Sequence, residues 1–159
     1  MKQLINTIFP IVCLIALCSC STTGKPEPWR EKSVAVTVKG DPQLNLYQND
    51  SHTLYLCTCQ LKDPNAFNQM VDESGGMEKL LSECNRFDAS VAYTKRYVVQ
   101  PGQTFNDRQD HAEGARFMGI VAGYYNMKKE NVVRLFRISK SLDMIIELGP
   151  RSILDIRER

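Results

Sequence analysis

The chain has 159 residues and a formal net charge of only +2, from 20 basic and 18 acidic side chains. So small a positive excess excludes a polybasic protein, and nucleic acid is therefore not expected as a partner. A chain of this length is long enough for one compact domain and too short for two.

The N-terminus carries the pattern of a bacterial lipoprotein signal peptide. Lys2 precedes an apolar run at residues 4–17, and the small Ser19 stands directly before Cys20. Cleavage between these two residues would leave Cys20 first in the mature chain, with a diacylglyceryl group on its sulfur. We therefore predict a signal peptide at residues 1–19 and a covalent lipid on Cys20. Ser21 follows in place of an aspartate, which favours the outer membrane, with the domain facing the periplasm.

Other interpretations of the apolar run at residues 4–17 account less well for its length and for the cysteine that follows it. An ordinary secretory signal gives no reason for a cysteine at the cleavage point. A transmembrane helix needs about 20 apolar residues, and this run is shorter and contains Asn6 and Thr7. Cys18 is a poorer lipid acceptor than Cys20, because the bulky Leu17 precedes it.

The mature part divides into a polar tether at residues 20–32 and a domain at residues 33–159. Trp29, the only tryptophan, is expected to pack against the edge of the domain, with a contact role as the alternative. Alternating apolar residues predict strands at 34–38, extended by 44–47, and at 54–61, with a polar loop at 48–52. Asp63-Pro64 predicts a helix start, and apolar residues at helical spacing predict a helical insert at 63–85.

Strand signals return after Asp88 and continue to the end of the chain. Residues 107–114 are expected to form a charged loop. Eight or so short strands predict a mainly β, two-sheet β-sandwich with its helical insert between strands 2 and 3. The later strands are expected at residues 93–99, 103–106, 116–125, 132–138, 144–148 and 153–156.

Three cysteines, Cys57, Cys59 and Cys84, remain in the mature domain. In an oxidising periplasm two of them should pair, either Cys57 or Cys59 with Cys84, and one should stay free. A Cys3His zinc site is the alternative, although C-x-C is tighter than the usual spacing.

No catalytic motif is present, which points to binding, with no metal, no cofactor beyond the lipid on Cys20 and no small-molecule substrate. The best cluster for chemistry is a single polar segment, for which a solvated turn is the simpler explanation; its members are Asp107, Asp110, His111 and Glu113.

Several segments together resemble the outer-membrane lipoprotein of the type VI secretion system, the TssJ (SciN, VasD) family. The resemblance runs from about residue 34 to about residue 138, and it agrees with the cysteine at position 20. The segments are CQLKDPNAFN at 59–68, RFD at 86–88, YVVQPGQ at 97–103 and ARFMGIVAGY at 115–124.

The resemblance implies a transthyretin-like β-sandwich that anchors the secretion machine by binding the periplasmic C-terminal domain of the inner-membrane protein TssM. It also implies a Cys57–Cys84 disulfide with Cys59 free, because the family commonly has an aromatic residue at the position of Cys59. Tyr47 is the expected anchor of the contact. The alternative is an envelope lipoprotein that inhibits an enzyme, or acts as an enzyme or ligand-binding module, through residues 107–113. The partner loop implied by the family is Leu46, Tyr47, Gln48, Asn49, Asp50, Ser51, His52 and Thr53.

Overall fold

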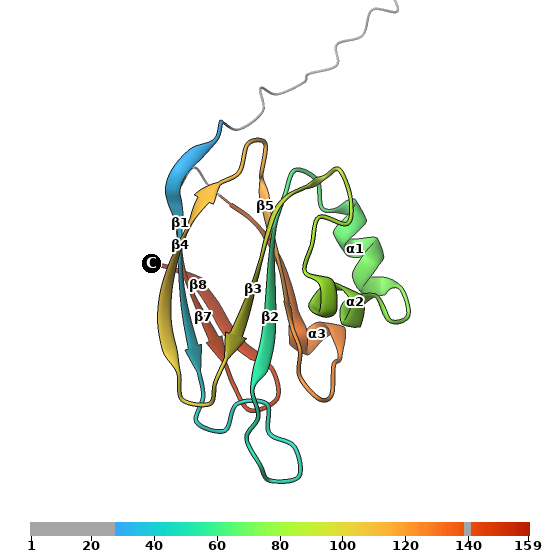
Figure 1. The fold of residues 1–159 in the computed structure, drawn as a ribbon, viewed down its shortest axis with the longest axis vertical. Coiled ribbons are helices and arrows are strands. Elements are labelled where there is room, and N and C mark those ends of the chain that lie inside the picture. The colour runs from blue at the N-terminus through green and yellow to red at the C-terminus, as the bar shows by residue number, and fades with distance from the viewer. Residues whose placement is uncertain (1–27, 139–140) are drawn as a thin grey trace, which may run out of the picture.

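The computed structural model describes residues 28–138 and 141–159, and Figure 1 shows them as two layers of strands with helices on one side. The predicted signal peptide, Cys20 and most of the tether lie outside the described residues. In chain order the elements are Arg30–Gly40 (β1), Leu54–Leu61 (β2), Asn65–Asp72 (α1), Gly76–Glu83 (α2), Val91–Val99 (β3), Thr104–His111 (β4), Phe117–Ala122 (β5), Lys129–Val132 (α3), Val133–Arg137 (β6), Leu142–Leu148 (β7) and Ile153–Glu158 (β8).

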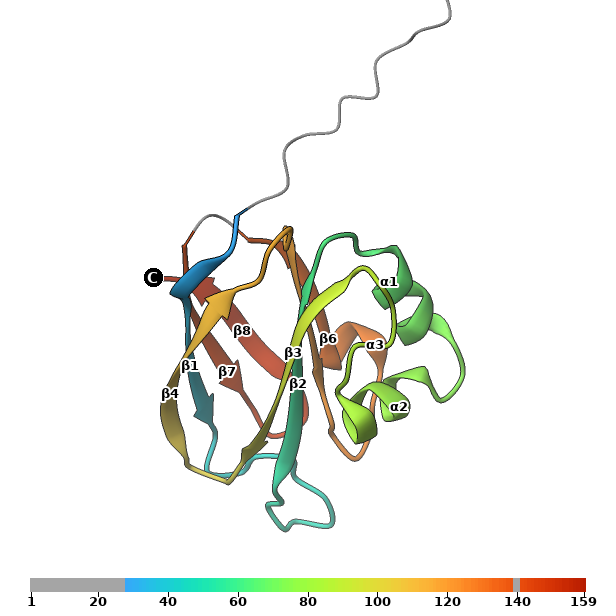
Figure 2. The ribbon, with the colours of Figure 1, turned by 45° about the horizontal axis from the view of Figure 1, so that its top comes forward.

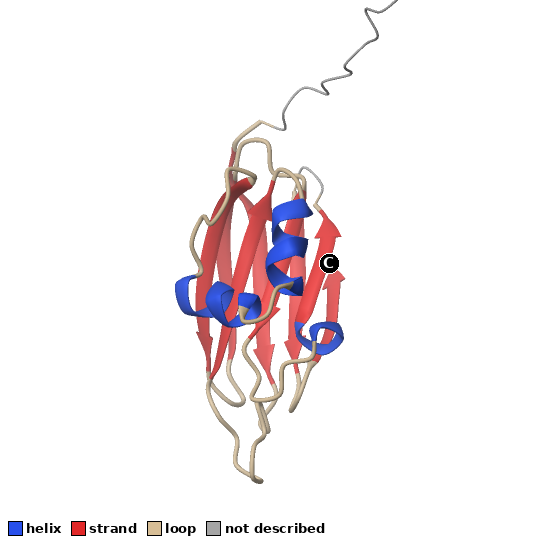
Figure 3. Cartoon of the chain, turned by 90° about the vertical axis from the view of Figure 1, so that its right-hand side faces the viewer, coloured by secondary structure: helices blue, strands red, loops and turns tan. Residues whose placement is uncertain are grey.

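The eight strands form two four-stranded sheets, in the orders β4-β1-β7-β8 and β3-β2-β5-β6. β1 and β7 are parallel, and the other neighbouring strands are antiparallel. Figures 2 and 3 show the helices outside the second sheet. The predicted mainly β sandwich with a helical insert between β2 and β3 is confirmed, and the short α3 is an addition.

Burial on both faces of the second sheet explains the composition of β2. Leu56 faces the other sheet and joins the sandwich core, whereas Cys57, Cys59 and Leu61 face α1 and α2. Successive side chains of a strand point to opposite faces. A strand between two apolar cores is therefore apolar almost throughout, and seven of the eight β2 residues are buried.

Two glycines of β5 and its exit allow the helices to approach the sheet closely. A Cβ on Gly119 would lie 2.7 Å from the Phe67 ring of α1. One on Gly123 would lie 3.2 Å from Leu81 of α2 and 3.3 Å from the Tyr55 carbonyl oxygen. The Gly119 to Gly123 spacing thus marks two packing points of the helical insert against the sheet.

Residues 107–114, predicted as a loop, are the largest correction. β4 continues through the charged segment to His111, which pairs with Arg30 of β1. The strand lies at the edge of its sheet, where polar side chains are tolerated. Its inward-facing polar groups have partners on the other sheet, described below.

Three smaller corrections concern boundaries. β1 begins at Arg30, inside the predicted tether, and Trp29, expected to pack against the domain edge, is 56% exposed. Residues 44–47 do not extend β1: residues 42–45 form a turn in which Asn45 adopts a left-handed φ of 50°, and Tyr47 pairs with Asp50 in an isolated bridge. Pro64, predicted as the first helical residue, is instead the N-cap of α1, and the Asp63 carboxylate accepts the backbone N–H of Asn65 at 2.9 Å.

Within the described ranges, none of the helices has the length and apolar character needed to cross a membrane.

Candidate functional site

The loop between β1 and β2 ends in a small rigid hairpin. Tyr47 and Asp50 exchange two backbone hydrogen bonds, each with an N to O distance of 2.9 Å. Gln48 and Asn49 between them have φ values of 50° and 69°. Positive φ at both central residues characterises a type I′ turn, the tight turn that suits a two-residue hairpin. The tip of the loop is therefore held by its own backbone.

Three rings gather beside this hairpin, and we call Tyr47, His52 and Tyr125 the aromatic cluster. The Tyr47 and Tyr125 rings are stacked, with centroids 4.4 Å apart and planes 17° apart. His52 meets the Tyr125 ring edge-on at 5.0 Å. Tyr47 is nevertheless 46% exposed and Tyr125 58% exposed. The cluster thus presents a preformed aromatic surface to solvent.

Hydrogen bonds connect this loop to two others. Asn45, only 5% exposed, donates from Nδ2 to the Thr53 carbonyl oxygen at 3.1 Å, and its Oδ1 accepts the backbone N–H of Tyr125 at 2.9 Å. The Leu46 N–H donates to the Pro150 carbonyl oxygen at 2.7 Å. The three loops enclose a cleft of about 270 Å³, whose lining includes Tyr47, Tyr125, Asn126 and Arg151.

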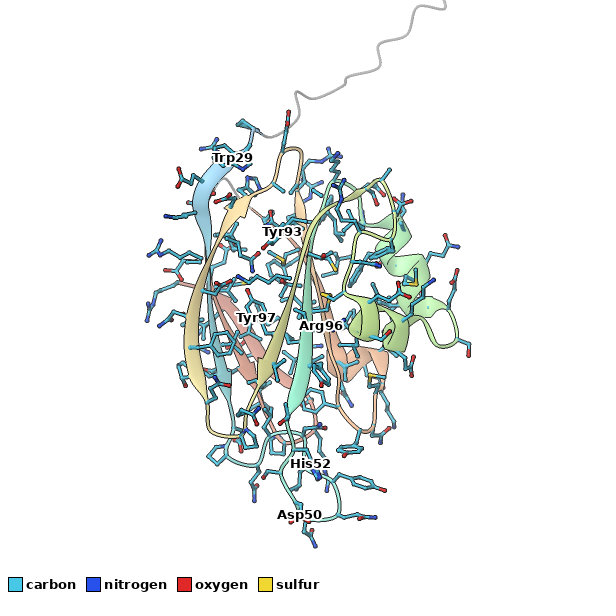
Figure 4. All side chains as sticks on the ribbon, in the orientation of Figure 1. Trp29, Asp50, His52, Tyr93, Arg96 and Tyr97 are labelled. Carbon is cyan, nitrogen blue, oxygen red and sulfur yellow. A yellow bond between two sulfur atoms is a disulfide. The ribbon has the colours of Figure 1, made fainter. Side chains whose placement is uncertain are left out.

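The structure brings the predicted partner loop to one end of the sandwich. Its tip, residues 47–51, is exposed, while Leu46 and His52 are half-buried. Figure 4 shows Asp50 and His52 at the end of the molecule opposite Trp29. Sequence reasoning missed Tyr125, although the Tyr124-Tyr125 pair at the end of a predicted strand carries a signal. One ring of such a pair points inward, and Tyr124 is 4% exposed.

The cluster that the sequence offered for chemistry (Asp107, Asp110, His111 and Glu113), called here the rival cluster, is a structural feature of the sandwich edge. β4 contributes Asp107, whose carboxylate accepts hydrogen bonds from Lys95 Nζ at 2.9 Å and the Tyr97 hydroxyl at 2.8 Å. Gln109 donates to the Tyr97 hydroxyl, and Gln60 donates to Gln109 Oε1 at 3.3 Å. We call these five side chains, Gln60, Lys95, Tyr97, Asp107 and Gln109, the polar seam, because they join β2 and β3 to β4 across the two sheets.

Burial and hydrogen bonding in the seam shift two pKa values. Burial of Asp107 alone would raise its pKa, but the hydrogen bonds from Lys95 and Tyr97 outweigh it and hold the pKa below its ordinary value of 3.8. Burial, followed by the hydrogen bond to Asp107, raises the pKa of Tyr97. Asp107 is therefore ionised and Tyr97 neutral at physiological pH.

The other members of the rival cluster do not converge on a site. His111 is 1% exposed, whereas Asp110 and Glu113 lie at the surface. Asp110 Oδ1 accepts the backbone N–H of Lys32 at 2.8 Å. Within residues 28–138 and 141–159, no group of three or more His, Cys, Asp or Glu side chains is placed to hold a metal ion.

Comparison with known families decides the classification. The model of the T6SS-SciN family, described as "Type VI secretion lipoprotein, VasD, EvfM, TssJ", matches residues 32–151, which is well over half of the chain. This protein belongs to the T6SS-SciN family. No curated protein sequence matches it significantly.

Solved structures show that this T6SS-SciN family member has the fold of known type VI secretion lipoproteins. The T6SS lipoprotein TssJ1 from Pseudomonas aeruginosa is 18% identical, with a TM-score of 0.69 over 81% of this chain and 97% of that one. Lip of Serratia marcescens is 17% identical, with a TM-score of 0.63 over 83% and 98%. A chain from the structure titled "T6SS protein TssM C-terminal domain" from EAEC is 13% identical, with a TM-score of 0.64 over 78% and 96%.

The cysteines of the T6SS-SciN domain are structural. Cys57 of β2 and Cys84, directly after α2, form a disulfide, which confirms the pairing implied by the family and excludes the Cys3His zinc site. Closing a loop of this length stabilises the fold by about 3 to 4 kcal/mol in the chain-entropy model. Cys59 keeps a free thiol 3.9 Å from the Cys57 sulfur, and burial raises its pKa to about 12. The thiol is therefore protonated and unreactive.

Proposed function

We propose that this T6SS lipoprotein anchors the trans-envelope complex of a type VI secretion system to the outer membrane. Its partner would be the periplasmic C-terminal domain of the inner-membrane protein TssM. The family match over residues 32–151 carries this proposal. A fold shared with a chain from a structure titled after the TssM C-terminal domain supports it.

The proposed binding surface consists of residues 46–53 together with Tyr125. Exposed aromatic rings contribute strongly when a partner removes them from water. Here Tyr47 and Tyr125 are already stacked, and the hairpin at Gln48 and Asn49 is closed by its own backbone. Binding would then cost little conformational entropy, because the surface is ordered before the partner arrives.

The role is mechanical, and no catalytic step is part of it. Acyl chains on Cys20 would hold one end of the protein in the outer membrane. Each buried CH2 contributes about 0.8 kcal/mol, so several chains anchor stably where one chain is marginal. The loop at the other end would bind a partner that is anchored in the inner membrane.

Calorimetric titration tests the partner and the site. The chain from Ser21 to Arg159 is titrated with the TssM C-terminal domain from the same genome, with residues 47–52 intact or replaced by glycine and serine. We expect binding only with the intact loop. Tyr93→Ser is the matched control, since it removes a 37% exposed tyrosine from β3 and should leave affinity unchanged. Binding that survives loop replacement would contradict the site, and absence of binding by the intact chain would contradict the function.

Secretion tests the anchor. Cys20→Ala, exported by an ordinary secretory signal, is expected to fold in the periplasm and to abolish type VI secretion. Normal secretion by this variant would refute the tethering role, whatever the affinity for the partner.

A further inference from the structure

Trp29 is a large apolar side chain that remains more than half exposed. It precedes the first residue of β1, and 56% of its surface is exposed. The indole ring of tryptophan is enriched at membrane–water interfaces, where its apolar body leaves water while its N–H stays hydrated. An exposed indole next to a predicted lipid anchor is therefore suited to the membrane–water interface.

The position of Trp29 sets the orientation of the whole sandwich. β1 runs from the Trp29 end toward the partner loop, and its 11 residues span about 36 Å at the usual rise per residue of a strand. Figure 4 shows Trp29 at one end of the molecule and Asp50 and His52 at the other. A surface that holds Trp29 thus has the aromatic cluster pointing away from it.

Charge at the Trp29 end is mixed. Exposed Lys62 and Arg116 lie there because the Arg116 N–H bonds to the Leu61 carbonyl at the end of β2. Exposed Asp110 and Glu113 belong to the same end, where β4 finishes. Cations and carboxylates offset one another, so charge selects neither an anionic nor a cationic surface. The indole ring, and not charge, is therefore the feature that favours a membrane–water interface.

We propose that the Trp29 end of the sandwich rests on the lipid surface that holds the protein's own acyl anchor, with the indole at the level of the headgroups. The proposal rests on lipidation of Cys20, which is part of the proposed function. Eight peptide steps separate Cys20 from Pro28, so the tether reaches at most about 29 Å. This short reach keeps the ring at a high effective concentration near the bilayer. The contact turns a loose tether into an oriented one and presents residues 46–53 toward the periplasm.

Fluorescence of the single tryptophan tests the contact. The mature acylated lipoprotein is reconstituted in vesicles of phosphatidylethanolamine and phosphatidylglycerol, with or without lipids brominated on the acyl chains. Flotation is measured first and should recover the protein with the vesicles. Trp29 emission should then lie at shorter wavelength than in the non-acylated chain. It should also be weaker with brominated lipid than without it, at both low and high salt. Aqueous acrylamide should quench it less than it quenches the non-acylated chain.

A tryptophan at the opposite end is the matched control. The double variant Trp29→Phe, Tyr47→Trp should float equally well, keep its intensity with brominated lipid and remain open to acrylamide. Failure to float would overturn the anchor and with it this contact. Flotation without quenching of Trp29 would overturn the contact and leave the anchor standing, and equal quenching at the two ends would overturn the orientation.

Discussion

The polar seam and the aromatic cluster both contain tyrosines, but the seam tyrosine is buried and the cluster tyrosines are exposed. In the seam, Tyr97 is 6% exposed and its hydroxyl is bonded to both Asp107 and Gln109. In the cluster, Tyr47 and Tyr125 stack on each other but remain about half exposed. The same residue type closes the fold at one site and faces solvent at the other.

The difference separates stability from binding. Buried polar groups that satisfy one another stabilise the structure and leave nothing to offer a partner. Ordered rings in contact with water have surface still to bury, which is where binding energy comes from. Substitutions in the seam should therefore change the free energy of unfolding, and substitutions in the cluster should change affinity.

The largest expected effect is that of Asp107→Ala. It removes the acceptor of the buried Tyr97 hydroxyl and of Lys95 Nζ. A buried donor left without a partner costs about 1 to 3 kcal/mol, so we expect the free energy of unfolding in urea to fall by about 2 to 3 kcal/mol. Arg108→Ala, on the exposed face of the same strand, should cost about 0.5 kcal/mol or less. Equal effects at the two positions would contradict a structural role for the seam.

Tyr125→Ala should weaken binding to the TssM C-terminal domain by about 2 kcal/mol, or about 30-fold in Kd. It removes the ring against which Tyr47 stacks but keeps the backbone N–H that bonds to Asn45. The free energy of unfolding should therefore change little. Tyr125→Phe preserves the ring and should retain most of the affinity in the same calorimetric titration. Full affinity in the alanine variant would remove Tyr125 from the site.

Acid should weaken the polar seam through protonation of Asp107. The pKa of Asp107 is lower in the folded protein than its ordinary value of 3.8, so its ionised form is favoured by folding. This contribution is present above pH 3.8 and is lost as the pH falls through the lower, folded value. Asp107→Asn should lack this component when unfolding is measured across the acid range. Identical acid profiles for the two proteins would show that Asp107 does not contribute.

The smallest expected effect is that of Asp110→Ala, which tests the rival function. Asp110 is exposed and accepts one backbone N–H, from Lys32, so its loss should cost about 0.5 kcal/mol or less. Secretion and TssM affinity should be unchanged. Loss of secretion by a folded Asp110→Ala variant would revive the enzyme or inhibitor hypothesis.

Local patterns in the sequence were sufficient for most of the fold. Alternation of apolar residues located β2 with its observed bounds, and helical spacing located α1 and α2 between β2 and β3. These signals are local because the side-chain period of a strand or helix is written within a few residues. The Cys57–Cys84 pair came from family resemblance, since spacing alone left Cys59 as an equal candidate.

Tertiary contacts decided the rest. The charged residues of β4 look like a loop in sequence, yet they form a strand because their backbone pairs with β1, and Lys95, Tyr97 and Gln60 supply side-chain hydrogen bonds from the other sheet. Tyr47 meets Tyr125 only because Asn45 joins two loops that are 80 residues apart in the chain. Periodicity reports which face of an element is apolar. It carries no information about partners that a distant segment provides, and those partners determined both the polar seam and the aromatic cluster.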